Sequence, residues 1–150
     1  MSVLFFDSSA LVKRYLTELG SAWVAAQTNP GSNNVIVVAE ITRVEVAAAL
    51  AARHRASGGI TRVERDRLFR LLALHHANEY RAVSISSAVA DQAMNLTQAH
   101  RLRGYDAVQL ATALAAAVAL PGLVFVAAAD DLLAAGRAEG LVAENPNQHA

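Results

Sequence analysis

The sequence contains no cysteine, only three prolines and few aromatic side chains, and Lys13 is its single lysine. The absence of cysteine excludes disulfides, thiolate-bound zinc and thiol nucleophiles. Charged residues are also sparse, at 17% against 54% hydrophobic residues, and this ratio excludes an intrinsically disordered chain. A length of 150 residues is enough to bury a sizeable core, so we expect a single domain over residues 1–150.

The chain carries no net charge, because 13 basic and 13 acidic residues cancel. The cancellation hides an asymmetry along the sequence. Twelve Lys or Arg face eight Asp or Glu up to Arg103, whereas one Arg faces five acids from Gly104 onward. Such a distribution suits either a polyanion bound by arginines beside a site that needs carboxylates, or an ordinary solvated surface.

One uncharged stretch, residues 107–129, is long enough to span a membrane. Pro121 and Gly122 interrupt it, and the first part is mostly alanine, so we interpret it as a helix, a turn and a strand. The first residues lack the basic start and long apolar run of a signal peptide. We therefore expect a cytoplasmic protein with no membrane association.

Short apolar runs alternate with segments of helical periodicity along the chain. The runs predict strands at Val3–Phe6, Val35–Val38, Ala82–Ile85, Leu123–Val126 and Leu141–Ala143. Helices are predicted between them, notably at Thr42–Arg55, Thr61–His76, Ser86–Arg101 and Tyr105–Leu120. This alternation predicts a three-layer α/β/α sandwich with a mainly parallel sheet of four or five strands.

Four acidic residues lie at or near predicted helix starts. Asp7 and Asp130 come directly after predicted strands, Asp106 opens the alanine-rich helix, and Glu45 lies in the first turn of its helix. Ligands of parallel sheets bind at the carboxyl ends of the strands, so one edge could gather all four. Taken singly, each aspartate is explained by helix capping, and Thr42 with Glu45 has capping-box spacing.

Four converging carboxylates need a counter-charge or protonation. Two carboxylates about 5 Å apart repel by roughly 3 kcal/mol at an effective dielectric near 20. None of the five histidines has a partner at metal-ligand spacing, and carboxylate oxygens alone suit Mg²⁺ or Mn²⁺. The sequence therefore predicts a Mg²⁺ or Mn²⁺ site made by Asp7, Glu45, Asp106 and Asp130.

Four segments carry a resemblance to a known family. They are Val3–Tyr15 (VLFFDSSALVKRY), Ile41–Val46 (ITRVEV), Leu102–Ala113 (LRGYDAVQLATA) and Phe125–Leu133 (FVAAADDLL). In this order and approximate spacing they resemble PIN-domain ribonucleases, particularly the VapC-type toxins of bacterial toxin–antitoxin pairs. The resemblance runs nearly end to end.

The resemblance implies that Asp7, Glu45 and Asp106 correspond to the family's three core acids. Glu40 is the nearest rival of Glu45, but it lacks the Thr-Arg residues that precede Glu45.

The fourth acid is Asp130 or Asp131. The family places a leucine three residues after this acid, which fits Asp130 with Leu133. Many members carry Ser or Thr two residues before it, where this chain has Ala128.

By the same resemblance the chain is a Mg²⁺- or Mn²⁺-dependent endoribonuclease that leaves a 5′-phosphate and a 3′-hydroxyl. Family members commonly form homodimers and are silenced by a small antitoxin protein. An alternative is a catalytically inactive PIN-like module that binds RNA or protein. Candidate substrate contacts are Arg103, Lys13 and Arg14, while Ser9 could bond an acid or a metal-bound water, or pack under the first helix.

Overall fold

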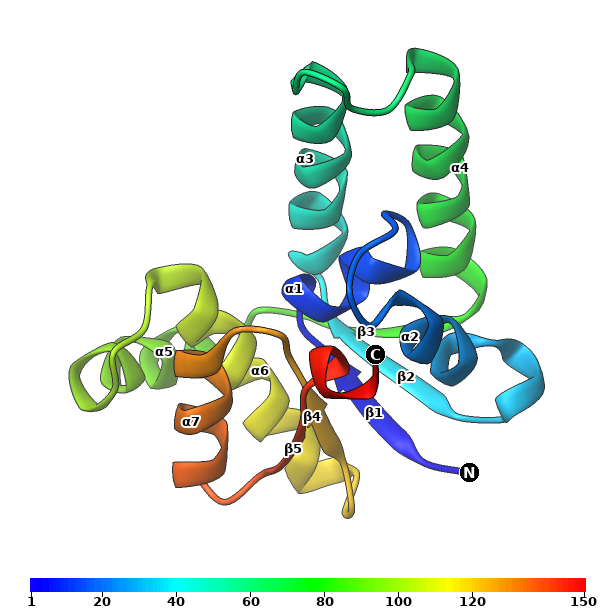
Figure 1. Cartoon of the computed structure of the whole chain (residues 1–150). Coiled ribbons are helices and arrows are strands. Elements are labelled where there is room, and N and C mark those ends of the chain that lie inside the picture. The colour runs from blue at the N-terminus through cyan, green and yellow to red at the C-terminus, as the bar shows by residue number, and fades with distance from the viewer.

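Five parallel strands form one sheet in the order β3-β2-β1-β4-β5. The computed structural model describes all residues from 1 to 150 (Figure 1). Its strands are β1 (Val3–Phe6), β2 (Val35–Ala39), β3 (Tyr80–Val83), β4 (Val124–Val126) and β5 (Val142–Glu144).

Helices cover both faces of this sheet (Figure 1). One face carries α1 (Ser8–Leu11), α2 (Ser21–Thr28), α3 (Thr42–Arg55) and α4 (Arg62–Asn78). The other face carries α5 (Ser87–Ala99), α6 (Gly104–Ala119) and α7 (Asp130–Ala138). Three short 3₁₀ helices complete the chain, namely η1 (Val12–Arg14), η2 (Pro30–Ser32) and η3 (Pro146–His149). The predicted three-layer α/β/α sandwich is confirmed.

The core is divided by the sheet because successive strand residues point to opposite faces. In β1, Leu4 and Phe6 pack against the α1–α4 layer, whereas Phe5 packs against the α5–α7 layer. Phe5 stacks on Phe125 of β4, with ring centroids 5.9 Å apart. Leu4, Phe5 and Phe6 are buried and Val3 is partly buried, which explains why a run of four apolar residues forms a central parallel strand.

Two local predictions are wrong. The third strand was expected at Ala82–Ile85 but runs from Tyr80 to Val83. Tyr80 starts it because its ring is buried and its hydroxyl meets that of Tyr15 at 2.6 Å, while Ser86 instead caps α5 through the N–H of Val89. The capping box expected from Thr42 does not form either, because Ile41 is the N-cap residue of α3.

The uncharged stretch folds as a helix, a turn and a strand, as predicted. Helix α6 ends at Ala119, Gly122 adopts a left-handed φ of 84°, and β4 begins at Val124. None of the helices combines the length and the hydropathy that a membrane-spanning segment requires.

The strand order determines where a ligand can approach. From the central β1, the chain goes first to β2 on one side and later to β4 on the other. The carboxyl ends of β1 and β4 therefore flank a topological switch point, where open α/β sheets bind their ligands. Beside it, α3 and α4 pack against each other as a hairpin that projects from the sheet (Figure 1).

Candidate active site

Asp7 lies at the carboxyl end of β1 and is the N-cap residue of α1. Its carboxylate accepts hydrogen bonds from the N–H of Ala10 at 3.0 Å and from the hydroxyl of Ser9 at 2.7 and 2.9 Å. The side chain is almost fully buried. Burial raises the pKa of Asp7 to about 7, the charge of Asp106 adds to this rise, and the hydrogen bonds oppose it. A buried carboxylate with such a pKa is typical of a functional site.

Ser9 connects Asp7 to the neighbouring strand. Its hydroxyl donates to the Asp7 carboxylate and accepts the backbone N–H of Ala128, just after β4, at 2.9 Å. Of the two partners expected for Ser9, the structure therefore shows the acid. Ser9 fixes Asp7 relative to the end of β4, which leads into α7.

Asp106 is the third residue of α6 and is half-buried. Burial raises the pKa of its carboxyl, the charges of Glu45 and Asp131 raise it further, and Arg103 lowers it. The N-cap residue of α6 is Arg103, which makes no side-chain cap. Asp106 is therefore not the N-cap residue of α6, and its carboxyl lies in the first turn of that helix, beside Glu45 and Asp131.

Glu45 lies close enough to Asp106 for its charge to raise the pKa of that carboxyl. One carboxylate oxygen, Oε1, accepts the hydroxyl of Ser8 at 2.6 Å and the Nε2 of Gln109 at 2.9 Å. Its rival Glu40 instead pairs with Arg43 at 2.8 Å and with His76 at 3.5 Å, at the base of the α3–α4 hairpin. Of these two glutamates, Glu45 is therefore the one whose charge raises the pKa of Asp106.

Asp130 and Asp131 are the first two residues of α7, and both are exposed. Ala129 is the N-cap residue, so neither acid caps the helix. Both border a cavity of about 590 Å³ together with Asp106 and two arginines, Arg101 and Arg103. This cavity joins α6 to α7 at the carboxyl edge of the sheet.

The donor set consists of carboxylates, which suits a hard divalent cation. No three Asp, Glu or His side chains are arranged to surround a metal ion directly, so an ion here would contact at most two carboxylates and reach the others through water. Mg²⁺ usually binds in this way, through one or two carboxylates, several waters and the phosphates of its substrate. The residues present therefore fit such an ion, with water-mediated contacts to the remaining acids.

Two of the predicted substrate contacts are engaged elsewhere. Lys13 is buried, 7% exposed, and its Nζ lies 3.3 Å from Glu18. Arg14 donates to Glu79 at 3.0 Å and to the hydroxyl of Tyr80 at 2.8 Å. Both cations are held by partners within the fold, which argues against a role in substrate binding.

Arg103 is exposed at the mouth of the acidic cavity and makes no ion pair with another side chain. Arg101, which sequence reasoning missed, is likewise exposed and lines the same cavity. These two cations lie beside Asp106, where a phosphate group would approach the acids.

A buried polar group that was not predicted from the sequence lies behind Glu45. Nε2 of Gln109, on α6, lies 2.9 Å from oxygens of Ser8, Thr42 and Glu45, and its two N–H groups are shared among these three acceptors. A glutamine at an inward position of an alanine-rich helix was the available signal, since a buried amide needs partners.

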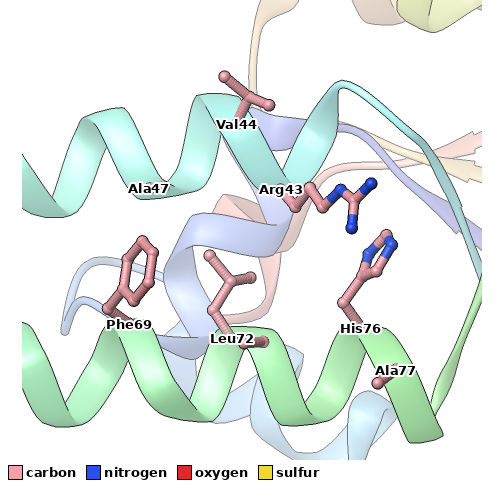
Figure 2. Close-up of a pocket in the computed structure, with 8 residues that line it drawn as sticks. Arg43, Val44, Ala47, Phe69, Leu72, His76 and Ala77 are labelled. Carbon is pink, nitrogen blue, oxygen red and sulfur yellow. The ribbon is translucent and has the colours of Figure 1, made fainter.

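A separate apolar groove of about 410 Å³ lies between α3 and α4. Figure 2 shows Phe69, Leu72 and His76 projecting from α4 toward α3, with Arg43 extending from α3 toward His76. Phe69 and Val44 of this groove are more than half exposed. An apolar cluster of this kind on a surface is typical of a protein-binding site.

A further apolar surface lies over α5 and α6. Met94 and Tyr105 are 68% and 63% exposed there, beside a cavity of about 480 Å³ that Ala90, Thr97 and Val108 also line.

Comparison with known proteins identifies a family and close relatives. The family model of the PIN domain matches residues 4–134. Ribonuclease VapC45 of Mycobacterium tuberculosis (strain CDC 1551 / Oshkosh) is 37% identical over 128 residues, which cover 83% of this chain and 82% of that protein.

Solved structures share the fold at lower sequence identity. A toxin–antitoxin complex from Klebsiella pneumoniae aligns with a TM-score of 0.61 at 20% identity, covering 95% of this chain and 97% of that one. Mycobacterium tuberculosis VapC20, a Sarcin-Ricin loop cleaving toxin, aligns with a TM-score of 0.63 at 16% identity, covering 93% and 96%.

Proposed function

The chain belongs to the PIN-domain family, and on this premise we propose that it is a Mg²⁺- or Mn²⁺-dependent endoribonuclease that acts as the toxin of a toxin–antitoxin pair. A relative whose alignment covers most of both chains is named a ribonuclease. The observation that carries the proposal is the electrostatic coupling of Asp106 to acids from three other elements, namely Asp7, Glu45 and Asp131. Acids gathered in this way serve a cation better than they serve the stability of a metal-free protein.

Asp7, Glu45, Asp106 and Asp130 would hold the ion, one or two of them directly and the others through water. A bound divalent ion lowers the pKa of a water and neutralises charge on the phosphoryl oxygens. Ser9 keeps the Asp7 carboxylate at the edge of the sheet through its bonds to Asp7 and Ala128. Asp131 is the alternative to Asp130, because both border the cavity.

Arg103 and Arg101 would bind the RNA backbone next to the acids. Contacts between arginines and phosphates supply most of the affinity that is independent of sequence, and they weaken as salt rises. Hydrolysis adds water across the phosphodiester. The bond from phosphorus to the 3′-oxygen breaks, which gives a 5′-phosphate and a 3′-hydroxyl.

A direct test is cleavage of total RNA by the purified protein with Mn²⁺, with Asp106→Asn as the matched variant. We expect cleavage by the wild type, its loss with EDTA, and at least a 100-fold lower rate for the variant. Sequencing of the RNA ends would then identify the cleavage site. If the wild type binds RNA without cleaving it, and Mn²⁺ binding is indifferent to Asp106→Asn, the chain is an inactive PIN-like binding module.

We further propose that the groove between α3 and α4 receives an apolar segment of the antitoxin. Its exposed Val44 and Phe69 offer an apolar surface to an amphipathic partner helix. The groove lies beside the acidic edge because α3 carries both Val44 and Glu45. A partner bound there could therefore extend over the active site.

We propose that the surface over α5 and α6 contacts a second copy of the chain in a homodimer. Met94 and Tyr105 supply exposed apolar area there, and light scattering with Met94→Glu tests this contact. We expect a dimeric wild type and a monomeric variant.

A further inference from the structure

We propose that Gln109 is a positioning residue for Glu45, and that with Ser8 it restrains one carboxylate oxygen and leaves the other, Oε2, to the active site. The inference deepens the proposed function and rests on it. Gln109 would orient the carboxylate of Glu45, and the acids proposed to hold the ion stay the same.

The contacts of Gln109 link three elements that meet behind the acidic edge. Gln109 belongs to α6, one turn after Asp106, and its side chain is 1% exposed. Its Nε2 lies 2.9 Å from the hydroxyl of Ser8 in α1, from that of Thr42 in α3, and from Oε1 of Glu45. One amide therefore couples the helix that carries Asp106 to the helix that carries Glu45.

The chemistry of the partners determines the orientation of the amide. An ionised carboxylate only accepts hydrogen bonds, so Gln109 must present its N–H groups and not its oxygen to Glu45. As a consequence, the Oε1 of Gln109 is buried without any hydrogen-bond partner. An unsatisfied buried acceptor destabilises a fold, and the other inward residues of α6 are alanine, leucine and threonine. Stability alone therefore does not explain a glutamine at this position.

The hydrogen bonds to Glu45 are asymmetric. The hydroxyl of Ser8 donates to Oε1 at 2.6 Å and Gln109 donates to the same oxygen at 2.9 Å, whereas no hydrogen bond reaches Oε2. Two donors on one oxygen restrict the rotation of a side chain that is otherwise flexible. The restrained carboxylate then offers one unoccupied oxygen at a reproducible place, which is the kind of support that metal sites need around their ligands.

The central experiment compares the wild type with Gln109→Leu. Leucine fills a similar side-chain volume, and it removes both the N–H donors and the unpaired acceptor Oε1. Three quantities are measured: Mn²⁺ affinity by calorimetry on the RNA-free protein, the thermal unfolding temperature without metal, and kcat and KM on RNA. We expect Mn²⁺ affinity and kcat to fall about 10-fold to 100-fold, with KM and the unfolding temperature little changed. Thr112→Val is the matched control, because Thr112 is buried on α6 one turn away and bonds only its own helix.

Ser8→Ala provides a second variant that does not alter the core of α6. It removes the other donor to Oε1, and we expect a smaller loss of Mn²⁺ affinity than in Gln109→Leu. In the double variant, the loss should be less than the sum of the two single losses. Normal Mn²⁺ affinity and kcat in both single variants, with cleavage by the wild type intact, would overturn the inference alone. A wild type that neither binds Mn²⁺ nor cleaves RNA would overturn the proposed function and this inference with it.

Discussion

The carboxylate of Asp106 on α6 acts electrostatically on that of Asp7, although Asp7 caps α1 on the opposite face of the sheet. The charge of Asp106 contributes to the raised pKa of Asp7, and Asp106 itself has a raised pKa through burial and the charge of Glu45. The metal-free site therefore opposes full ionisation of its own acids. This conflict predicts how stability should depend on pH and on metal.

Asp7→Asn should stabilise the metal-free protein at pH 8. The pKa of Asp7 is about 7 in the folded protein against 3.8 ordinarily, so the folded state binds more protons between these values. Stability therefore falls as pH rises from about 4 to 7, and above pH 7 the whole destabilising effect is present. In EDTA we expect the variant to gain at least about 1 kcal/mol at pH 8 and almost nothing at pH 4, measured by urea unfolding.

The control is Asp91→Asn, an exposed acid of α5, which should show no such dependence on pH. Added Mn²⁺ should stabilise the wild type and not Asp7→Asn. A variant that is less stable than the wild type at pH 8 in EDTA would contradict the raised pKa.

The sheet and the acids could be predicted because they depend on local patterns. Four apolar residues followed by Asp7 indicate both a buried strand and an acid at its carboxyl end. Sequence patterns do not indicate how individual side chains are partnered. Lys13 pairs with Glu18 across a turn and Arg14 bonds Tyr80 of a distant strand, and no periodicity indicates which cations are engaged in this way. Gln109 was missed for the same reason, since its role depends on residues from two other helices.

Arg103→Ala should weaken RNA binding without affecting stability. Arg103 is exposed beside the acids and free of ion pairs, so its removal should eliminate about one phosphate contact. We expect the slope of log affinity against log salt to become shallower by about one. Fluorescence anisotropy with a labelled RNA and Asp106→Asn protein, in Mg²⁺ buffer, measures this slope while preventing cleavage.

Arg14→Ala should lower stability without affecting RNA binding. Loss of its bonds leaves Glu79 and Tyr80 without their cation, and we expect unfolding to become easier by about 2 kcal/mol. The salt slope of RNA binding should equal that of the wild type. A shallower slope with unchanged stability would instead indicate that Arg14 contacts the RNA.

Phe69→Ala should release the enzyme from its inhibitor while leaving RNA cleavage intact. Phe69 is 54% exposed and lines the groove between α3 and α4, so its removal costs the fold little but deletes a large apolar contact from a partner. Such anchors often account for 2 kcal/mol or more of binding. The measurement is growth of cells that express the chain together with its candidate antitoxin.

Val63→Ala is the comparison for this prediction, because Val63 is 75% exposed on α4 and lies outside the groove. Cells with Val63→Ala should still be rescued by the antitoxin, whereas cells with Phe69→Ala should not. Equal rescue of both variants would place the inhibitor on another surface.

Asp130→Asn and Asp131→Asn should differ in activity although the two residues are adjacent. Both acids border the cavity that contains Asp106, but Asp130 is the first residue of α7 and the nearer of the two to the end of β4. We expect Asp130→Asn to lower kcat about 100-fold, which corresponds to about 2.7 kcal/mol of transition-state stabilisation, and Asp131→Asn to lower it only a few-fold. The charge of Asp131 contributes to the raised pKa of Asp106, so Asp131→Asn should also shift the acidic limb of the rate profile to lower pH. If Asp131→Asn has the larger effect on kcat instead, the fourth acid is Asp131, the second residue of α7.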